Sequence, residues 1–138
     1  MNEDNGYDFY RSFFAVLAGV LSAIATGFII KFIFQKFLNF DPLDEFTSRE
    51  SNLMIQLAVG SWLFLSSLVG GIVCAVIAGG NELSHIIIGS LVVLALYFLV
   101  GGTAIFNERS ISSWVILLTI PVGYSIGEWL GGMNRSKA

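Results

Sequence analysis

The chain has 138 residues, of which 55% are hydrophobic and only 12% are charged, and its mean hydropathy is +0.78. A soluble domain this short buries a small fraction of its surface and normally carries about a quarter charged residues, so the composition excludes an ordinary water-soluble fold. The net charge of −3 leaves no basic surface for nucleic acid, and the single cysteine excludes an intrachain disulfide or a CxxC metal site.

The first predicted element is a membrane span over residues 12–38, preceded by an acidic segment. An uncharged run extends from Ser12 to Ile30, and Lys31 and Lys36 follow on the same predicted helix, where their ammonium groups can reach the headgroup region. A cleaved signal peptide would have a basic start and a shorter apolar core. We therefore interpret this run as a retained span.

Three further apolar runs predict spans at residues 53–79, 84–106 and 112–131, since a helix needs roughly 20 apolar residues to cross a bilayer. An acidic connection over residues 39–52 separates the first two spans. The short turn between the second and third spans predicts that these helices are adjacent and antiparallel. The sequence therefore predicts one all-α domain over residues 1–138, a multi-pass membrane four-helix bundle.

Three of the predicted spans carry small residues at four-residue spacing, a pattern that lets membrane helices pack closely. These candidate helix-packing residues are Ala15, Gly19, Ala23 and Gly27 in the first span, Ser67, Gly71, Ala75 and Gly79 in the second, and Gly123, Gly127 and Gly131 in the fourth. Two interpretations stay open. Either the stripes hold the helices of one chain together, or at least one stripe, with that of the fourth span as the main candidate, docks against another subunit.

Glu82, His85 and Glu128 are the polar residues near span ends that are candidates for a functional role. Glu82 and His85 are three residues apart and can share a helical face, as a proton relay or as half of a metal site between protomers. Alternatively, His85 lies at the interface with its ring nitrogens in water or on a backbone carbonyl. Glu128 is either an ion site or an anchor at the headgroup level.

The sequence contains no recognisable set of catalytic residues. Ser84 directly precedes His85, and neighbouring residues on a helix point apart, so a Ser–His–acid group is not formed. One histidine and one glutamate do not complete a zinc shell. No charged residue lies at the centre of a predicted span, which disfavours a proton-coupled transporter built from this chain alone. We predict that the protein is not an enzyme and has no cofactor and no metal.

From the second span onward, the chain resembles a group of small bacterial four-span membrane proteins with no assigned activity. The residues that carry this resemblance are Gly70 and Gly71, Ala78 to Gly80, Ser84 and His85, Gly89, Pro121, and the closing segment Gly127 to Gly132. Members of the group have basic residues in the turn between the second and third spans, where this chain has Asn81 and Glu82. The resemblance implies a location in the bacterial inner membrane, with both termini in the cytoplasm.

Two functional hypotheses follow from these features. In the first, the protein is a non-catalytic accessory or scaffold subunit, or an assembly factor, whose partners are the lipid bilayer and other membrane protein subunits in a homo- or hetero-oligomer. In the second, it is a small oligomeric channel or transporter with a pore at the subunit interface. The helical stripes, the acidic connection and the absence of charge at the span centres favour the first hypothesis.

Overall fold

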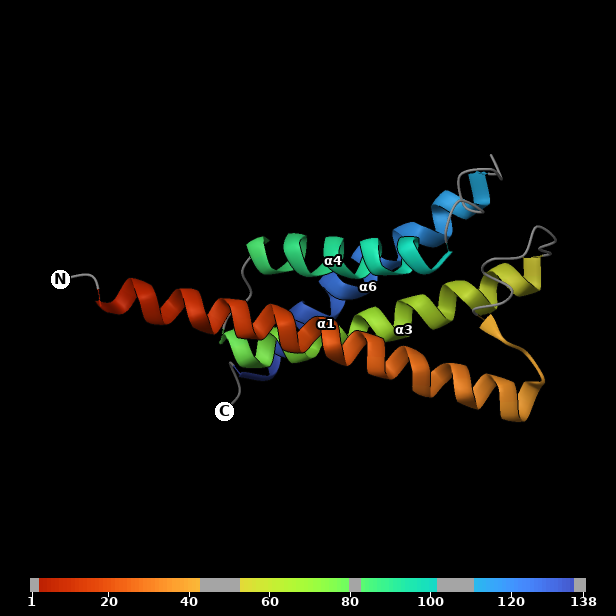
Figure 1. The fold of residues 1–138 in the computed structure, drawn as a ribbon, viewed down its shortest axis with the longest axis horizontal. Helices are drawn as coiled ribbons and strands as arrows, with labels where there is room; N and C mark the ends of the chain where they lie inside the picture. Colours follow the sequence, from red (N-terminus) through yellow and green to blue (C-terminus); the bar gives the residue numbers. More distant parts are fainter. Residues whose placement is uncertain (1–2, 43–52, 80–82, 102–110, 136–138) are drawn as a thin grey trace.

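The structure is a computed structural model of the chain, and it describes residues 3–42, 53–79, 83–101 and 111–135. Over these residues the protein forms four long α-helices and no β-strand, which confirms the all-α prediction. The helices are α1 (Glu3–Leu38), α3 (Leu53–Ala78), α4 (Leu83–Gly101) and α6 (Ile111–Arg135). They lie side by side and alternate in direction along the long axis of the molecule (Figure 1).

Two of these helices are long and apolar enough to cross a bilayer. The candidate spans are Asp8–Leu38 in α1 and Leu57–Ala78 in α3, whereas the apolar part of α4, Leu83–Tyr97, is shorter than a span. The described residues therefore give two candidate spans, and the four-span topology stays a prediction. Residues 43–52 of the acidic connection and residues 102–106 of the predicted third span lie outside the described residues.

Two helices end with a residue in the left-handed region of backbone conformation. Gly79 follows α3 with a φ of 83°, and its N–H donates to the carbonyl oxygen of Ala75 over 3.1 Å. Glycine adopts this conformation without steric strain and caps the free carbonyl groups at the helix end. Asn39 follows α1 with a φ of 50°, which turns the chain back so that Phe40 packs edge-on against Phe34.

Helix α3 packs along both α1 and α6, whereas α4 is held by fewer contacts, mainly with α6 and α1. The buried core residues come from all four helices and include Val20, Trp62, Val93 and Tyr124. The indole N–H of Trp62 donates to the carbonyl oxygen of Gly27 over 2.8 Å, which ties α3 to α1. Helices α1, α3 and α6 thus form a tight unit, in which α3 is antiparallel to α1 and parallel to α6. Helix α4 packs on this unit more loosely.

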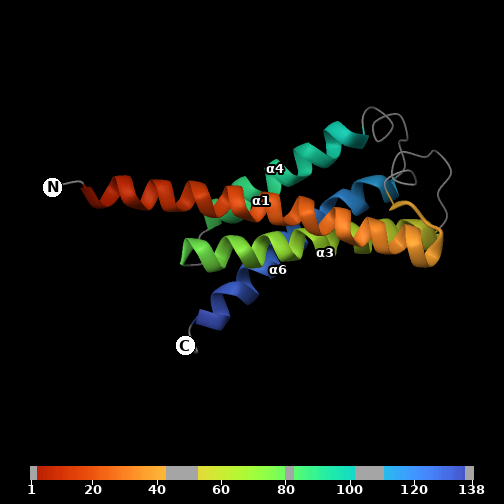
Figure 2. The ribbon, with the colours of Figure 1, turned by 60° about the horizontal axis from the view of Figure 1, so that its bottom comes forward.

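The N-terminal turns of α1 extend past the ends of α3 and α4, as two views of the ribbon show (Figures 1 and 2). Arg11 marks the point where the projection begins, because its guanidinium group donates to the carbonyl oxygen of Ile77 near the end of α3, over 3.1 Å. Phe9 and Tyr10, directly before Arg11 in the sequence, are 68% and 64% exposed. Exposed aromatic side chains therefore lie at the point where α1 extends past the other described helices.

Candidate functional site

Helices α3 and α6 meet at a contact formed largely by glycine residues, which have no side chain. We call this contact the α3–α6 seam. A Cβ atom on Gly123 would lie 2.7 Å from the carbonyl oxygen of Phe64, and one on Gly131 would lie 2.9 Å from that of Ile72. Between them, a Cβ on Gly127 would collide with the carbonyl oxygen of Leu68. Real Cβ atoms do not approach backbone this closely, so α6 must present glycine at each of these three turns.

The α3 side of the seam contributes its own small residues. A Cβ on Gly71 would collide with the carbonyl oxygen of Tyr124 and would lie 2.8 Å from the backbone nitrogen of Glu128. Ser67 and Ala75, one turn before and after Gly71, are fully buried. The two helix backbones are therefore in direct contact over several turns, which gives close van der Waals packing without large side chains.

The small residues of α1 also lie at contacts within the chain. Ala15 and Ala23 are fully buried, and a Cβ on Gly19 would lie 2.8 Å from the carbonyl oxygen of Gly70 on α3. Gly27 accepts the hydrogen bond from Trp62. The structure thus brings the predicted stripes of α1, α3 and α6 together inside one chain, and it places Gly79 at the turn after α3.

Tyr124 lies where all four helices converge, and its ring is fully buried. A Cβ on Gly19 of α1 would lie 2.5 Å from the Tyr124 hydroxyl, and one on Gly89 of α4 would overlap the ring. The thiol of Cys74, on α3, lies close to both the Tyr124 hydroxyl and the Glu128 carboxyl group. We call Cys74, Tyr124 and Glu128 the buried polar cluster.

Glu128 and His85 lie inside the bundle, with 0% and 3% of their surfaces exposed. His85 comes one helical turn before Gly89, and Glu128 one turn after Tyr124. Because Gly89 packs on the Tyr124 ring, both residues lie one turn from this contact, towards the same end of the bundle. Glu82, the third polar candidate, lies outside the described residues.

Chemistry at this cluster is limited by its composition. In the part of the chain that the structure describes, no group of three or more His, Cys, Asp or Glu side chains could hold a metal ion. The buried polar cluster lies between closely packed helices, with Cys74, Tyr124 and Glu128 all fully buried. This arrangement suits structural hydrogen bonding between packed helices.

The side of the molecule formed by α1 and α4 is open, because these helices leave two grooves between them. The wide groove, of about 410 Å³, lies towards the N-terminal half of α1. It is lined by Phe9, Ser12, Phe13, Val16, Leu17 and Val20 of α1 and by Ser84, His85, Ile88 and Val92 of α4. Most of its surface is apolar, and its polar lining residues are Ser12 of α1 and Ser84 and His85 of α4.

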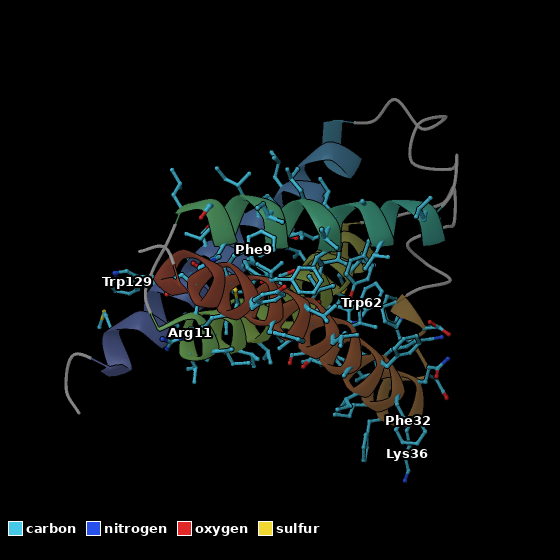
Figure 3. All side chains as sticks on the ribbon, turned by 60° about the vertical axis from the view of Figure 1, so that its left-hand side comes forward. Phe9, Arg11, Phe32, Lys36, Trp62 and Trp129 are labelled. Atoms are coloured by element: carbon cyan, nitrogen blue, oxygen red, sulfur yellow. The ribbon has the colours of Figure 1, made fainter. Side chains whose placement is uncertain are left out.

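The narrow groove, of about 160 Å³, lies towards the C-terminal half of α1. It is lined by Ile24, Gly27, Phe28 and Lys31 of α1, Trp62 of α3, and Leu96 and Tyr97 of α4. The Lys31 ammonium group lies 3.5 Å from a carboxylate oxygen of Asp41. Phe32 and Lys36, farther along α1, point away from the bundle (Figure 3).

The sequence reasoning missed both grooves and the Lys31–Asp41 ion pair. It interpreted Lys31 as a side chain reaching towards the headgroups, and it gave Trp62 and Tyr97 no role. The available signal for the ion pair was an acidic residue, Asp41, soon after a helix whose C-terminal turns carry Lys31 and Lys36, but its use required the turn at Asn39. No protein-family profile, curated protein or solved structure matches this chain.

Proposed function

We propose that the chain is a four-span membrane protein that acts as a non-catalytic subunit of a larger membrane complex, docking through the face formed by α1 and α4. The observation that carries this proposal is the exposure of α1. Only 28% of its most apolar stretch is buried within the chain, against 44% for α3. A helix this apolar needs lipid or another protein over the rest of its surface.

The four-span topology is supported by the lengths and directions of the helices. Helix α6 has 25 residues and α4 has 19, which correspond to about 37 Å and 28 Å of helix, close to the thickness of a bilayer core. Because the four helices alternate in direction, the same end of the bundle holds the start of α1 and the end of α6. Both termini then lie on the same side of the membrane.

The exposed surface of α1 between residues 13 and 33 is apolar. Its large exposed side chains are Phe13, Phe14, Leu17, Leu21, Phe28, Ile29, Phe32 and Ile33. On α4 the exposed residues include Ile87, Ile88, Leu91 and Val92. A transmembrane helix of a partner can lie against the part of this face that borders the wide groove, near Phe13, and insert side chains into the groove, which Ser12 and Ser84 also line.

Charge indicates the chemistry of the partner. Residues 1–11 contain three acidic side chains (Glu3, Asp4 and Asp8) and one basic side chain (Arg11). The N-terminal turns of α1, whose sequence carries this net negative charge, extend past the ends of α3 and α4. A basic segment next to a transmembrane helix of the partner is complementary to this projection.

The alternative, a channel with its pore at a subunit interface, receives less support. Such a pore needs polar side chains on the face where subunits meet. The polar residues Ser66, Ser67 and Glu128 are instead buried inside the chain. The exposed central parts of α1 and α4 that the structure describes are apolar, which favours the subunit role.

Photocrosslinking in native membranes tests the docking face. With a photoreactive residue in place of Phe13, we expect one discrete adduct that contains a membrane protein with a basic segment beside a transmembrane helix. The matched control is Phe32, which is similarly exposed (63% against 55%) but lies at the other end of α1, and we expect no such adduct there. Asp8→Lys should weaken the Phe13 adduct.

Three results would contradict the proposal. One is the absence of a protein adduct at Phe13, another is equal adducts at Phe13 and Phe32, and the third is an adduct of twice 15.0 kDa that contains only this chain.

The topology has a separate test. In a Cys74→Ala background, single cysteines at Asn5 and Ser136 should react with an impermeant reagent from the same side of the membrane, and reaction from opposite sides would exclude four spans.

A further inference from the structure

We propose that the narrow groove binds one acyl chain of a zwitterionic phospholipid, whose headgroup lies on the Lys31–Asp41 ion pair. The inference rests on the membrane residence in the proposed function, but not on the proposed partner. The groove runs from Ile24 to Lys31 along α1, a rise of about 10 Å, with Leu96 and Tyr97 of α4 on its other side. Trp62 of α3 forms its floor between these two helices.

The interior of the groove is apolar because its two polar aromatic residues turn their polar atoms into the protein. The Trp62 N–H donates to Gly27, and the Tyr97 hydroxyl lies 3.2 Å from the Ser66 hydroxyl, within hydrogen-bonding distance. The two rings pack edge-to-face with centroids 5.2 Å apart. Both polar groups are therefore satisfied within the chain, and the groove presents hydrocarbon surface that suits an acyl chain.

Lys31 lines one end of the groove and is paired with Asp41, so a positive and a negative group lie together at this end. Lys31 and Asp41 are 21% and 16% exposed, so both side chains are held in place and still accessible. The Gln35 amide also donates to Asp41, which fixes the carboxylate. A zwitterionic headgroup such as phosphoethanolamine has a phosphate for the lysine and an ammonium for the aspartate, whereas an anionic headgroup would meet the aspartate as a like charge.

The level of this ion pair agrees with a headgroup site. Lys31 lies one turn after Gly27, and Gly27 is level with Trp62 and Tyr97. Helix α4 ends at Gly101, one turn beyond Tyr97. The ion pair is therefore close to the helix ends, where a headgroup and the upper part of its acyl chain would lie together.

Native mass spectrometry of the detergent-purified protein with equal amounts of phosphatidylethanolamine and phosphatidylglycerol tests the site. We expect one retained phosphatidylethanolamine per chain. Ile24→Trp fills the groove and should abolish retention, whereas Ile29→Trp, at a position that is 61% exposed outside the groove, should leave it unchanged. Equal retention by the two variants, with equal melting temperatures, would overturn the proposal.

The headgroup preference has its own variants, at partly exposed positions outside the buried core. Asp41→Asn removes the negative group and should shift the preference towards phosphatidylglycerol by roughly fivefold, the strength of a partly exposed charge pair. Lys31→Met should weaken phosphatidylethanolamine retention, and Lys36→Met, whose ammonium group lies outside the groove, should not. No change in preference with Asp41→Asn would refute the headgroup assignment. A crosslink at Phe13 without retained lipid would refute this site and leave the proposed subunit role standing.

Discussion

The α3–α6 seam and the α1–α4 side of the bundle contrast in how closely two helices approach. Along the seam, Gly71, Gly123 and Gly127 let the backbones of α3 and α6 touch. Between α1 and α4, side chains such as Phe13, Val16 and Val92 keep the helices apart and leave the wide groove. Both regions are apolar, so hydrophobicity does not distinguish them. The size of the residue at each turn does.

This contrast separates a structural region from a region available for binding. In a membrane there is no hydrophobic gain when apolar helices associate, and dispersion contacts and hydrogen bonds hold them instead. The seam gains many such contacts, whereas the α1–α4 side leaves contacts that lipid or a partner can supply. Substitutions should therefore be destabilising along the seam and tolerated in the wide groove.

The largest effect is expected at the centre of the seam. Gly127→Ala places a methyl group against the Leu68 carbonyl and must separate α3 from α6, which should destabilise the fold by about 3 kcal/mol, the upper range for overpacking. Gly60→Ala is the matched control, because its Cβ would meet only the Thr119 methyl group, at 3.9 Å. Thermal unfolding in detergent measures both. Similar melting temperatures for the two variants would show that the seam is not tight.

Next in size is the loss of a buried side chain beside the seam. Glu128→Ala should destabilise the protein by about 2 kcal/mol, because it leaves a cavity next to Cys74 and Tyr124. Glu128→Gln keeps the shape and most hydrogen-bonding capacity and should lose less than half of that amount. The same unfolding assay applies. If the Gln variant is the less stable of the two, the carboxylate charge rather than side-chain volume holds the cluster together.

A smaller effect is expected where α1 joins α3. Trp62→Phe removes the donor to the buried Gly27 carbonyl and should lower stability by about 1 kcal/mol. Ser61→Ala removes a hydroxyl that bonds to Leu57 at the exposed surface of the same helix, and should have little effect. Equal stability of the two variants would show that the Trp62 hydrogen bond contributes nothing to the association of α1 with α3.

The smallest effect is expected in the wide groove. Val92→Phe adds volume to a position that is 40% exposed and lines empty space, so stability should change by less than about 0.5 kcal/mol. The variant should nevertheless weaken the crosslink from Phe13 to the partner. A large loss of stability would instead indicate that α4 packs against α1 more tightly than the groove implies.

The amino-acid sequence by itself determined the helices. Long uncharged runs and their spacing predict α1, α3, α4 and α6, because backbone groups in an apolar setting must be paired within a helix. The spacing of Gly123, Gly127 and Gly131 also predicts that α6 has a close-packing face. This information is local, since it depends only on the period of one helix.

Only the tertiary structure decided which faces meet. The small-residue stripe of α6 was compatible with packing either against a partner subunit or against α3. Which of the two it contacts depends on the positions of all four helices together. The same holds for Glu128, whose burial comes from neighbours on α3, and for the Lys31–Asp41 pair, which needs the turn at Asn39. Contacts between residues distant in the chain are set by packing in three dimensions, and the pattern of a single helix does not contain them.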